Sequence, residues 1–186
     1  MYKTLVAVMT AALFSVFSCG TGGAAEYKDA GVLLGKLKES KRSLADGVIQ
    51  AGQTDGYPIS AKFEMDGDEL SLSVYTASEG RGPDSEHNSL MELSGDPTKE
   101  TWEPKKEVFQ DKEHIARAAM HLTLMQLTSL GLMDAIEKAA ARQPGTVYSV
   151  APAIRDGKPV FDVLVATSDD NSASLTLDLL TGSVLQ

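Results

Sequence analysis

The chain has 186 residues, of which 42% are hydrophobic and 23% charged, a composition that fits one modest globular domain or two very small ones. Seventeen basic against 26 acidic residues give a net charge of −9, so phosphate backbones and anionic lipid surfaces are expected to repel it. A single cysteine excludes an internal disulfide, a multi-cysteine zinc site and a protein-ligated iron–sulfur cluster. We therefore expect no nucleic-acid partner and no cofactor.

The first 18 residues have the composition of a signal peptide. Lys3 supplies one positive charge, and an apolar run follows from Leu5 to Phe17. This run is shorter than the roughly 20 apolar residues that a transmembrane helix needs, and no later stretch of the sequence approaches that length. We therefore expect residues 1–18 to direct export and then to be removed.

The sequence Val16-Phe17-Ser18-Cys19 resembles a bacterial lipoprotein signal. In such signals the cysteine thiol accepts a diacylglyceryl group and becomes the new N-terminus. The resemblance therefore predicts lipidation of Cys19, a flexible tether over residues 19–26 and a protein anchored by lipid in the cell envelope or periplasm. Ordinary secretory cleavage after Ala25 is the alternative, and it would discard Cys19 and release a secreted soluble protein.

Two stretches offset by 88 to 91 residues show the same order of patterns, which predicts an internal repeat. Residues 44–51 and 132–139 both place apolar side chains at i, i+4 and i+7, the spacing of one helix face. A glycine, Gly56 or Gly145, follows each predicted helix. Ser43-Leu-Ala-Asp46 resembles a capping box and predicts the start of the first helix.

Three strands are predicted after each helix. Apolar and polar residues alternate, as they do in a strand with one buried face, and Asp-Gly dipeptides mark the hairpin turns. The predicted strands are residues 59–65, 70–74 and 90–93 in the first half and 147–154, 161–165 and 175–179 in the second, with turns at Asp66-Gly67 and Asp156-Gly157. Three antiparallel strands with one apolar face need a helix across that face for stability.

These patterns predict an α+β fold of two tandem units, each a helix packed on a three-stranded antiparallel sheet. We place the first unit at residues 27–104 and the second at 105–186, with a charged, proline-containing linker over 96–107. Trp102 lies in this linker, and we expect it to pack between the two units. Further helical patterns precede the two predicted helices, at residues 32–37 and 115–125.

The second unit resembles a PepSY domain from about Gly145 to Gln186. The resemblance is carried by Asp156-Gly157, and above all by the ending Asp178-Leu-Leu-Thr181-Gly182. PepSY sequences typically close with an Asp, two variable residues, Thr-Gly and a hydrophobic residue. Within this ending, Asp178, Thr181 and Gly182 are predicted to form a structural turn in which the glycine accommodates an unusual backbone angle. The first unit is similar but has Glu92-Leu-Ser-Gly95 in place of the motif, so its assignment as a degraded copy follows from the internal repeat.

The resemblance implies an extracytoplasmic binding module without catalytic residues. PepSY domains occur in the propeptides of thermolysin-type metalloproteases and in small exported proteins, and they are proposed to bind or inhibit peptidases. We therefore expect a protein or peptide partner, with an extracytoplasmic peptidase as the implied class and strand addition to an open sheet edge as the contact. Two alternatives stay open: a structural envelope lipoprotein without a free edge, and a hydrolase or metal-binding enzyme.

Candidate reactive groups are few. His114 and His121 are seven residues apart and would share a helix face, but no HExxH motif and no third ligand accompanies them. His87 lies in a polar loop near carboxylates, where a solvated side chain is expected. The enzyme alternative requires His114 or His121 to face a concave site together with carboxylates. We predict no catalytic residue and no metal site.

Overall fold

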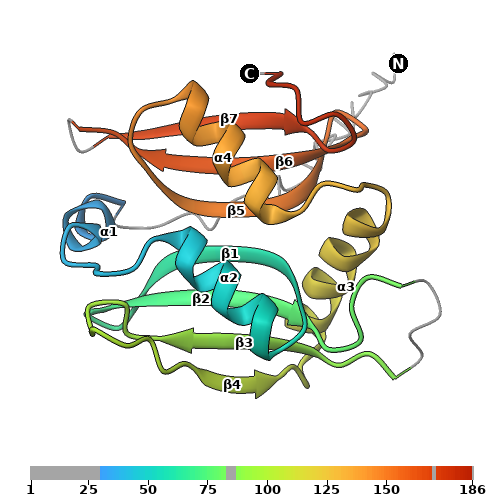
Figure 1. Ribbon diagram of the computed structural model, residues 1–186, viewed down its shortest axis with the longest axis horizontal. Coiled ribbons are helices and arrows are strands. Elements are labelled where there is room, and N and C mark those ends of the chain that lie inside the picture. The colour runs from blue at the N-terminus through green and yellow to red at the C-terminus, as the bar shows by residue number, and fades with distance from the viewer. Residues whose placement is uncertain (1–29, 83–86, 169–170, 186) are drawn as a thin grey trace, which may run out of the picture.

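The computed structural model describes residues 30–82, 87–168 and 171–185. Within these ranges the chain forms four helices and seven strands: α2 is followed by four consecutive strands in the first half, and α4 by three in the second (Figure 1). The elements are α1 (Ala30–Leu37), α2 (Leu44–Thr54), β1 (Tyr57–Asp66), β2 (Glu69–Ala77), β3 (Leu90–Gly95), β4 (Lys105–Val108), α3 (Lys112–Gln126), α4 (Leu132–Arg142), β5 (Thr146–Arg155), β6 (Lys158–Ala166) and β7 (Ser172–Asp178).

The seven strands form one antiparallel sheet in the order β4-β3-β2-β1-β5-β6-β7 (Figure 1). The α+β class is confirmed, but the strands of the two halves join in a single sheet instead of two separate ones. The junction is short, because β1 and β5 pair only at Ala61–Val150 and Lys62–Ser149, whereas each pairs with its hairpin partner along nearly its whole length. One row of facing residues crosses every strand: Lys106, Leu93, Val74, Ala61, Val150, Val163 and Leu175.

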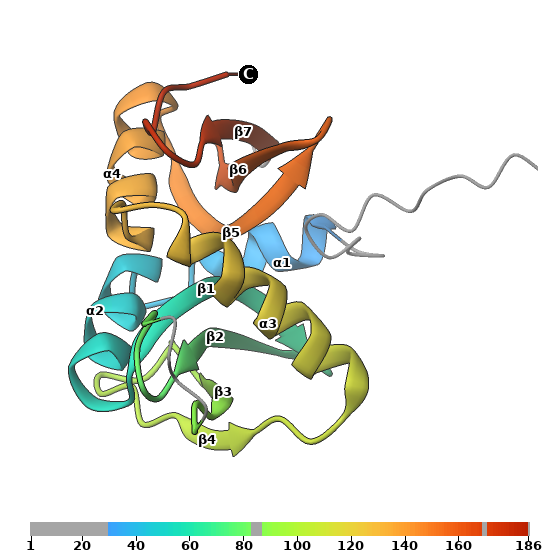
Figure 2. The same cartoon turned by 90° about the vertical axis from the view of Figure 1, so that its right-hand side faces the viewer.

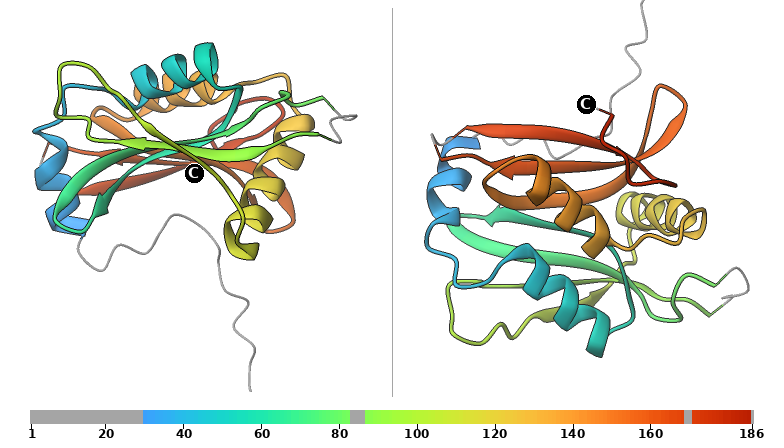
Figure 3. Two further views of the ribbon diagram at one scale, coloured as in Figure 1. Left: turned by 90° about the horizontal axis from the view of Figure 1, so that it is seen from below. Right: turned by 45° about the horizontal axis from the view of Figure 1, so that its top comes forward.

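Helices α2 and α4 lie side by side across one face of the sheet, whereas α1 and α3 lie toward the two ends of the opposite face (Figure 2 and Figure 3). Burial of apolar side chains between the sheet and the helices α2 and α4 is the main stabilising term, at about 25 cal/mol per Å² of apolar surface buried. Several strand residues of this core have no exposed surface, among them Phe63, Leu72, Val74, Val150, Phe161, Val163 and Leu177. The buried helix residues include Leu44, Val48 and Ala51 of α2 and Leu132, Ile136 and Ala139 of α4.

Helix α2 begins at the predicted capping box. Ser43 Oγ accepts a hydrogen bond from Asp46 N at 3.1 Å, and Asp46 Oδ2 accepts one from Ser43 N at 2.8 Å. At the start of α4, Gly131 offers no side chain, but Asp134 Oδ2 accepts from Gly131 N at 2.7 Å. Both helices therefore begin with a carboxylate in the first turn, which satisfies a free N–H group and suits the helix dipole.

Two glycines connect these helices to the strands that follow. Gly56 has a φ of +102° and Gly145 a φ of +147°, values that side chains rarely adopt. A methyl group on either glycine would also overlap the carbonyl oxygen of the last residue in the neighbouring hairpin strand, Ala77 or Ala166. Because both the backbone angle and the close approach exclude a Cβ, the two halves make the same use of glycine at this connection.

Two parts of the first half differ from the prediction. β4 was not expected, and it pairs with β3 although residues from 105 onward were assigned to the second unit. Trp102 is buried, with its Nε1 donating to Gly95 O at 3.3 Å and its carbonyl accepting from Gln50 Nε2 at 2.9 Å. These contacts lie within the first half, so the placement of Trp102 between the units was wrong. An isolated aromatic residue in a linker has no periodicity that identifies its neighbours.

The signal peptide over 1–18, the tether over 19–26 and the lipidation site Cys19 lie outside the described residues. Within the described ranges, the helices are all too short or too polar to cross a membrane.

Candidate functional site

The sheet has two outer edges, β4 and β7, because β1 and β5 meet at its centre (Figure 1). The outer side of an edge strand presents main-chain N–H and C=O groups to which an extended segment can add. The central pairing covers part of the edges of β1 and β5. The alternative of a structural lipoprotein without a free edge requires such coverage at every edge. The outer sides of β4 and β7 are therefore the surfaces at which strand addition has to be considered.

β4 is a poor template for strand addition. It is four residues long, all four are exposed, and Lys105, Lys106 and Glu107 are charged. Lys106 Nζ also forms an ion pair at 2.8 Å with Asp55 Oδ1, at the end of α2. Short edge strands that carry lysine resist pairing with other chains, so this edge is protected.

β7 has the opposite character. Its first six residues, Ser172 to Leu177, carry no charge, and Ser172 and Ser174 are exposed. In an antiparallel strand, alternate residues direct both main-chain groups to the same side. Thr176 identifies the outer side, because its carbonyl accepts from Leu185 N at 2.8 Å, outside the β6–β7 ladder. Ser172 and Ser174 share this alternation, so their N–H and C=O groups point outward.

The outward groups of Ser172 and Ser174 have no main-chain partner among the described residues. The Ser172 side chain is held separately, with its Oγ 2.6 Å from the Tyr148 hydroxyl. Beside Ser174, on the face opposite α4, lies the half-buried side chain of Leu164. The start of β7 is therefore an ordered, uncharged edge with free main-chain groups and an apolar neighbour.

The later part of the same edge is occupied by the segment Ser183–Leu185. Leu185 N donates to Thr176 O at 2.8 Å, Asp178 N donates to Ser183 O at 2.8 Å, and Val184 forms an antiparallel bridge with β7. The side chains of Val184 and Leu185 are 39% and 52% exposed. Main-chain hydrogen bonds, and not buried side chains, therefore hold this segment in place.

The motif that carries the PepSY resemblance builds the turn between β7 and this segment. Asp178 Oδ1 accepts from Thr181 N at 2.8 Å, Thr181 Oγ1 at 2.9 Å and Leu180 N at 3.1 Å. The Thr181 main-chain bond, followed by the Thr181 hydroxyl bond, holds the pKa of Asp178 below its ordinary value. Gly182 has a φ of +69°, the kind of backbone angle predicted for it, and its N–H donates to Asp178 O at 2.8 Å. Asp178, Thr181 and Gly182 thus direct the chain back along β7.

The two histidines of α3 have different surroundings. His114 Nδ1 lies 2.8 Å from Asp111 Oδ2, and its ring stacks on Phe109 with the centroids 5.2 Å apart. His121 is buried, with its Nδ1 3.0 Å from Ser60 Oγ. Burial, and to a smaller extent the charge of Arg117, lowers the pKa of His121 to about 4. His121 is therefore neutral at ordinary pH and anchors α3 to β1.

A polar cluster lies on the sheet face that α3 partly covers. Glu64 accepts from Ser73 Oγ at 2.6 Å and forms an ion pair with Lys62. Burial raises the pKa of the nearby Glu92, and the charge of Glu64 acts in the same direction, while the neighbouring Ser73 hydroxyl opposes both. These groups satisfy one another to a large extent. Throughout residues 30–82, 87–168 and 171–185, no three His, Cys, Asp or Glu side chains gather as a metal site would require.

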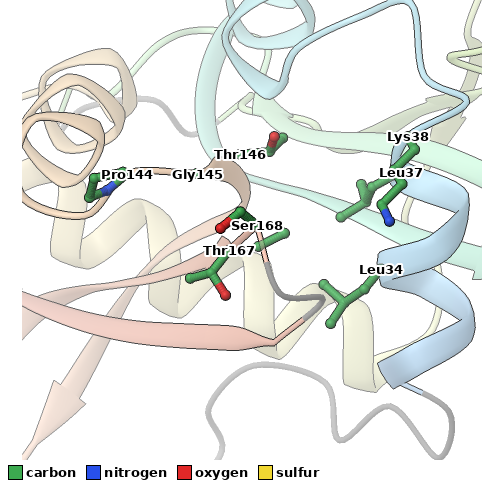
Figure 4. A pocket seen from close by; sticks show the side chains of 9 residues that line it. Leu34, Leu37, Lys38, Pro144, Gly145, Thr146, Thr167 and Ser168 are labelled. Atoms are coloured by element: carbon green, nitrogen blue, oxygen red, sulfur yellow. The ribbon is translucent and has the colours of Figure 1, made fainter.

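A small pocket of about 300 Å³ lies between α1 and the paired ends of β5 and β6 (Figure 4). Leu34 and Leu37 form its apolar wall, and Thr146 and Ser168 lie across from them (Figure 4). Titratable side chains do not converge in it. The pocket is at the same end of the sheet as Ser172, which pairs with its lining residue Ala166.

Sequence reasoning identified a strand from residue 175 and therefore missed the free edge at Ser172 and Ser174. The alternation of Ser172-Ala-Ser174-Leu175 is the signal that could have extended the strand. That this strand lies at the edge of the sheet follows from the order of all seven strands. The alternation of residues within one strand carries no information about that order.

No model of a known protein family matches the sequence, and no curated protein matches it. A solved structure that matches is that of a Clostridium difficile 630 protein described as a lipoprotein, with 20% sequence identity, a TM-score of 0.37 and coverage of 79% of this chain and 92% of that chain. A TM-score of 0.37 does not demonstrate a common fold, so this similarity assigns neither a family nor a function to the chain.

Proposed function

We propose that this chain is an exported, non-enzymatic envelope protein that binds an extended segment of another protein along the outer edge of β7. The observation that supports this function is the uncharged start of β7, where the outward main-chain groups of Ser172 and Ser174 have no main-chain partner among the described residues. An added antiparallel strand would satisfy these groups and extend the sheet by one strand.

The main-chain contacts alone would give weak binding. The outward groups of Ser172 and Ser174 can form up to four hydrogen bonds, which together contribute about 4 kcal/mol, or roughly millimolar affinity. Further affinity has to come from side chains on either side of the added strand. Leu164, half-buried beside Ser174, offers such a contact on the face opposite α4.

The sequence pattern around Cys19 supports lipid anchorage in the cell envelope as part of the same proposal. Mass spectrometry of the chain recovered from membranes of its own cells tests this part. We expect an N-terminal diacylglyceryl cysteine, whereas a chain that begins after Ala25 would contradict the anchor.

An extracytoplasmic peptidase is the partner class that the PepSY resemblance implies. If a peptidase is the partner, its activity on a peptide substrate is expected to fall as the full chain is added in stoichiometric amounts. Unchanged activity of a peptidase that binds would limit the function to docking and contradict inhibition.

The binding edge can be tested by photo-crosslinking in the cell envelope. A benzophenone amino acid is placed at Ser172 in the full chain, and the crosslinked partner is quantified with and without Ser174→Pro. Proline removes the outward N–H of residue 174 but is tolerated in an edge strand whose N–H faces solvent. We expect Ser174→Pro to reduce the crosslink strongly, and Ser174→Ala, which keeps the N–H, to leave it unchanged.

Two further positions control for unspecific capture: a benzophenone at Gln53, on the exposed surface of α2, and one at Glu107, on the protected β4 edge. Neither should give the Ser172 adduct. Equal crosslinks from all three positions, or a Ser172 crosslink that Ser174→Pro does not change, would contradict strand addition. No crosslink at Ser172 in a folded chain would favour the structural envelope lipoprotein instead.

A further inference from the structure

We infer that Ser183–Leu185 occupies part of the partner's site on β7 and competes with the partner strand for it. This inference rests on the proposed function, since it assumes that a partner adds to β7. The segment bonds to the carbonyl of Thr176 and the N–H of Asp178. Like the main-chain groups of Ser172 and Ser174, these two groups point to the outer side of β7. A partner that paired with the whole of β7 would need the same two groups.

The segment is attached in a way that permits exchange. Two hydrogen bonds, from Leu185 N and to Ser183 O, join it to β7, and the side chains of Val184 and Leu185 remain largely exposed. The turn before it is held by Asp178 Oδ1, which accepts from Thr181, and Ser183 is tied to this turn because its N–H donates to Thr181 Oγ1 at 3.2 Å. Val184 and Leu185 can therefore leave the edge while the turn and the core under β7 stay intact.

The segment also indicates the chemistry of the strand that fits this edge. It runs antiparallel to β7, it carries no charge, and it places an aliphatic side chain, Val184, opposite Leu177. We therefore assign to the partner an uncharged extended segment with aliphatic residues, running antiparallel to β7. Such residues also have high strand propensity, which favours the extended conformation before binding.

The experiment measures binding of a fluorescein-labelled peptide of sequence GSVLQVS, which extends the chain's own segment, to the full chain by fluorescence anisotropy. Leu185→Pro removes the N–H that bonds to Thr176 and is expected to open the edge. Because the variant no longer has to break the bond from Leu185 N to Thr176 O before the peptide binds, we expect about tenfold tighter peptide binding. Leu185→Ala keeps the N–H and removes an exposed side chain, so it should bind like the unmodified chain.

A chain shortened after Ser183 provides a second route to the open edge, because it keeps the bond from Asp178 N to Ser183 O. Its melting temperature is measured alongside to establish that it is folded, and we expect it to match Leu185→Pro in affinity. Adding Ser174→Pro to either open variant is expected to remove the gain.

Equal peptide affinity of the unmodified, Leu185→Pro and shortened chains would overturn the competition. So would a gain in affinity that Ser174→Pro leaves in place, because the peptide would then bind elsewhere. These failures are distinct from failure of the proposed function, which is judged from the Ser172 crosslink in the envelope. A crosslink that depends on residue 174 but is unaffected by Leu185→Pro would retain the function and reject the competition.

Discussion

His121 makes the stability of the fold dependent on pH in a range where most carboxylates are still ionised. The imidazole is 7% exposed, its Nδ1 lies 3.0 Å from Ser60 Oγ, and the positive charge of Arg117 acts on it from the same helix. Protonation would place a charge in this buried site, close to a second positive charge. The folded state therefore favours the neutral ring.

The magnitude follows from the difference in pKa between the two states. Burial lowers the pKa of His121 from 6.5 to about 4 in the folded chain, whereas the unfolded chain keeps an ordinary value. Each tenfold difference in proton affinity corresponds to about 1.4 kcal/mol, so the site accounts for about 3 kcal/mol. Because the unfolded state binds the proton more tightly, this stability is fully present above pH 6.5, is lost as the pH falls toward 4, and does not change further below 4.

The assay is urea unfolding from pH 7.5 to 3.5, followed by the fluorescence of Trp102, which is buried and is the chain's single tryptophan. His121→Gln serves as the reference, because the amide can still bond to Ser60 but does not titrate. Contributions from carboxylates cancel when the two unfolding free energies are subtracted. We expect the difference to change by about 3 kcal/mol between pH 7 and pH 4, with the wild type losing more.

A difference that stays constant over this range would refute the placement of His121 in the core. It would mean that the ring titrates with the same pKa in the folded and unfolded chains, as an exposed histidine does. If the wild type instead lost less stability than His121→Gln, a carboxylate would have to lie beside His121. Among the described residues, the only charged group that shifts the pKa of His121 is Arg117.

Three substitutions test the local geometry, each by its effect on the free energy of unfolding. Gly145→Ala should destabilise the chain by about 2 kcal/mol or more, because φ is +147° and the methyl group meets the Ala166 carbonyl. Gly67→Ala is the control, because its Cβ meets nothing within 4 Å. A loss for Gly145→Ala no larger than that of the control would contradict the close approach. Gly182→Val should cost about 1–2 kcal/mol from its φ of +69°, so an unchanged melting temperature would count against the turn. Ser43→Ala should cost about 1 kcal/mol by removing the N-cap of α2, and a neutral result would show that the capping box does not stabilise the helix.

Much of the fold can be predicted because the relevant signals are local. The alternation over 59–65 and 161–165, the Asp-Gly turns and the Ser43–Asp46 capping box each depend on residues close together in the chain, and the structure contains the corresponding strands, turn positions and cap. Gly56 and Gly145 belong to the same group, since a helix followed by glycine is a local pattern.

The rest depends on contacts between distant parts of the chain. Alternation shows that Ala61 and Val150 face a core, but it does not show that their strands are neighbours, so one sheet was predicted as two. β4 carries three charged residues in four and has no alternation to detect. Likewise, Ser172 and Ser174 become an open edge only because every other strand lies on one side of β7. Two statements stay predictions: that the two halves are copies of one repeated unit, and that they are PepSY domains.

Hydrogen–deuterium exchange of the chain, with and without the partner that crosslinking identifies, tests the binding edge most directly. The amides of Ser172 and Ser174 point away from the β6–β7 ladder and should exchange rapidly in the free chain. When the partner is added, we expect these two amides to become protected while those of the β4 edge stay unchanged. Protection confined to β4 or to the outer surface of α2, with Ser172 and Ser174 still exchanging rapidly, would contradict strand addition at β7.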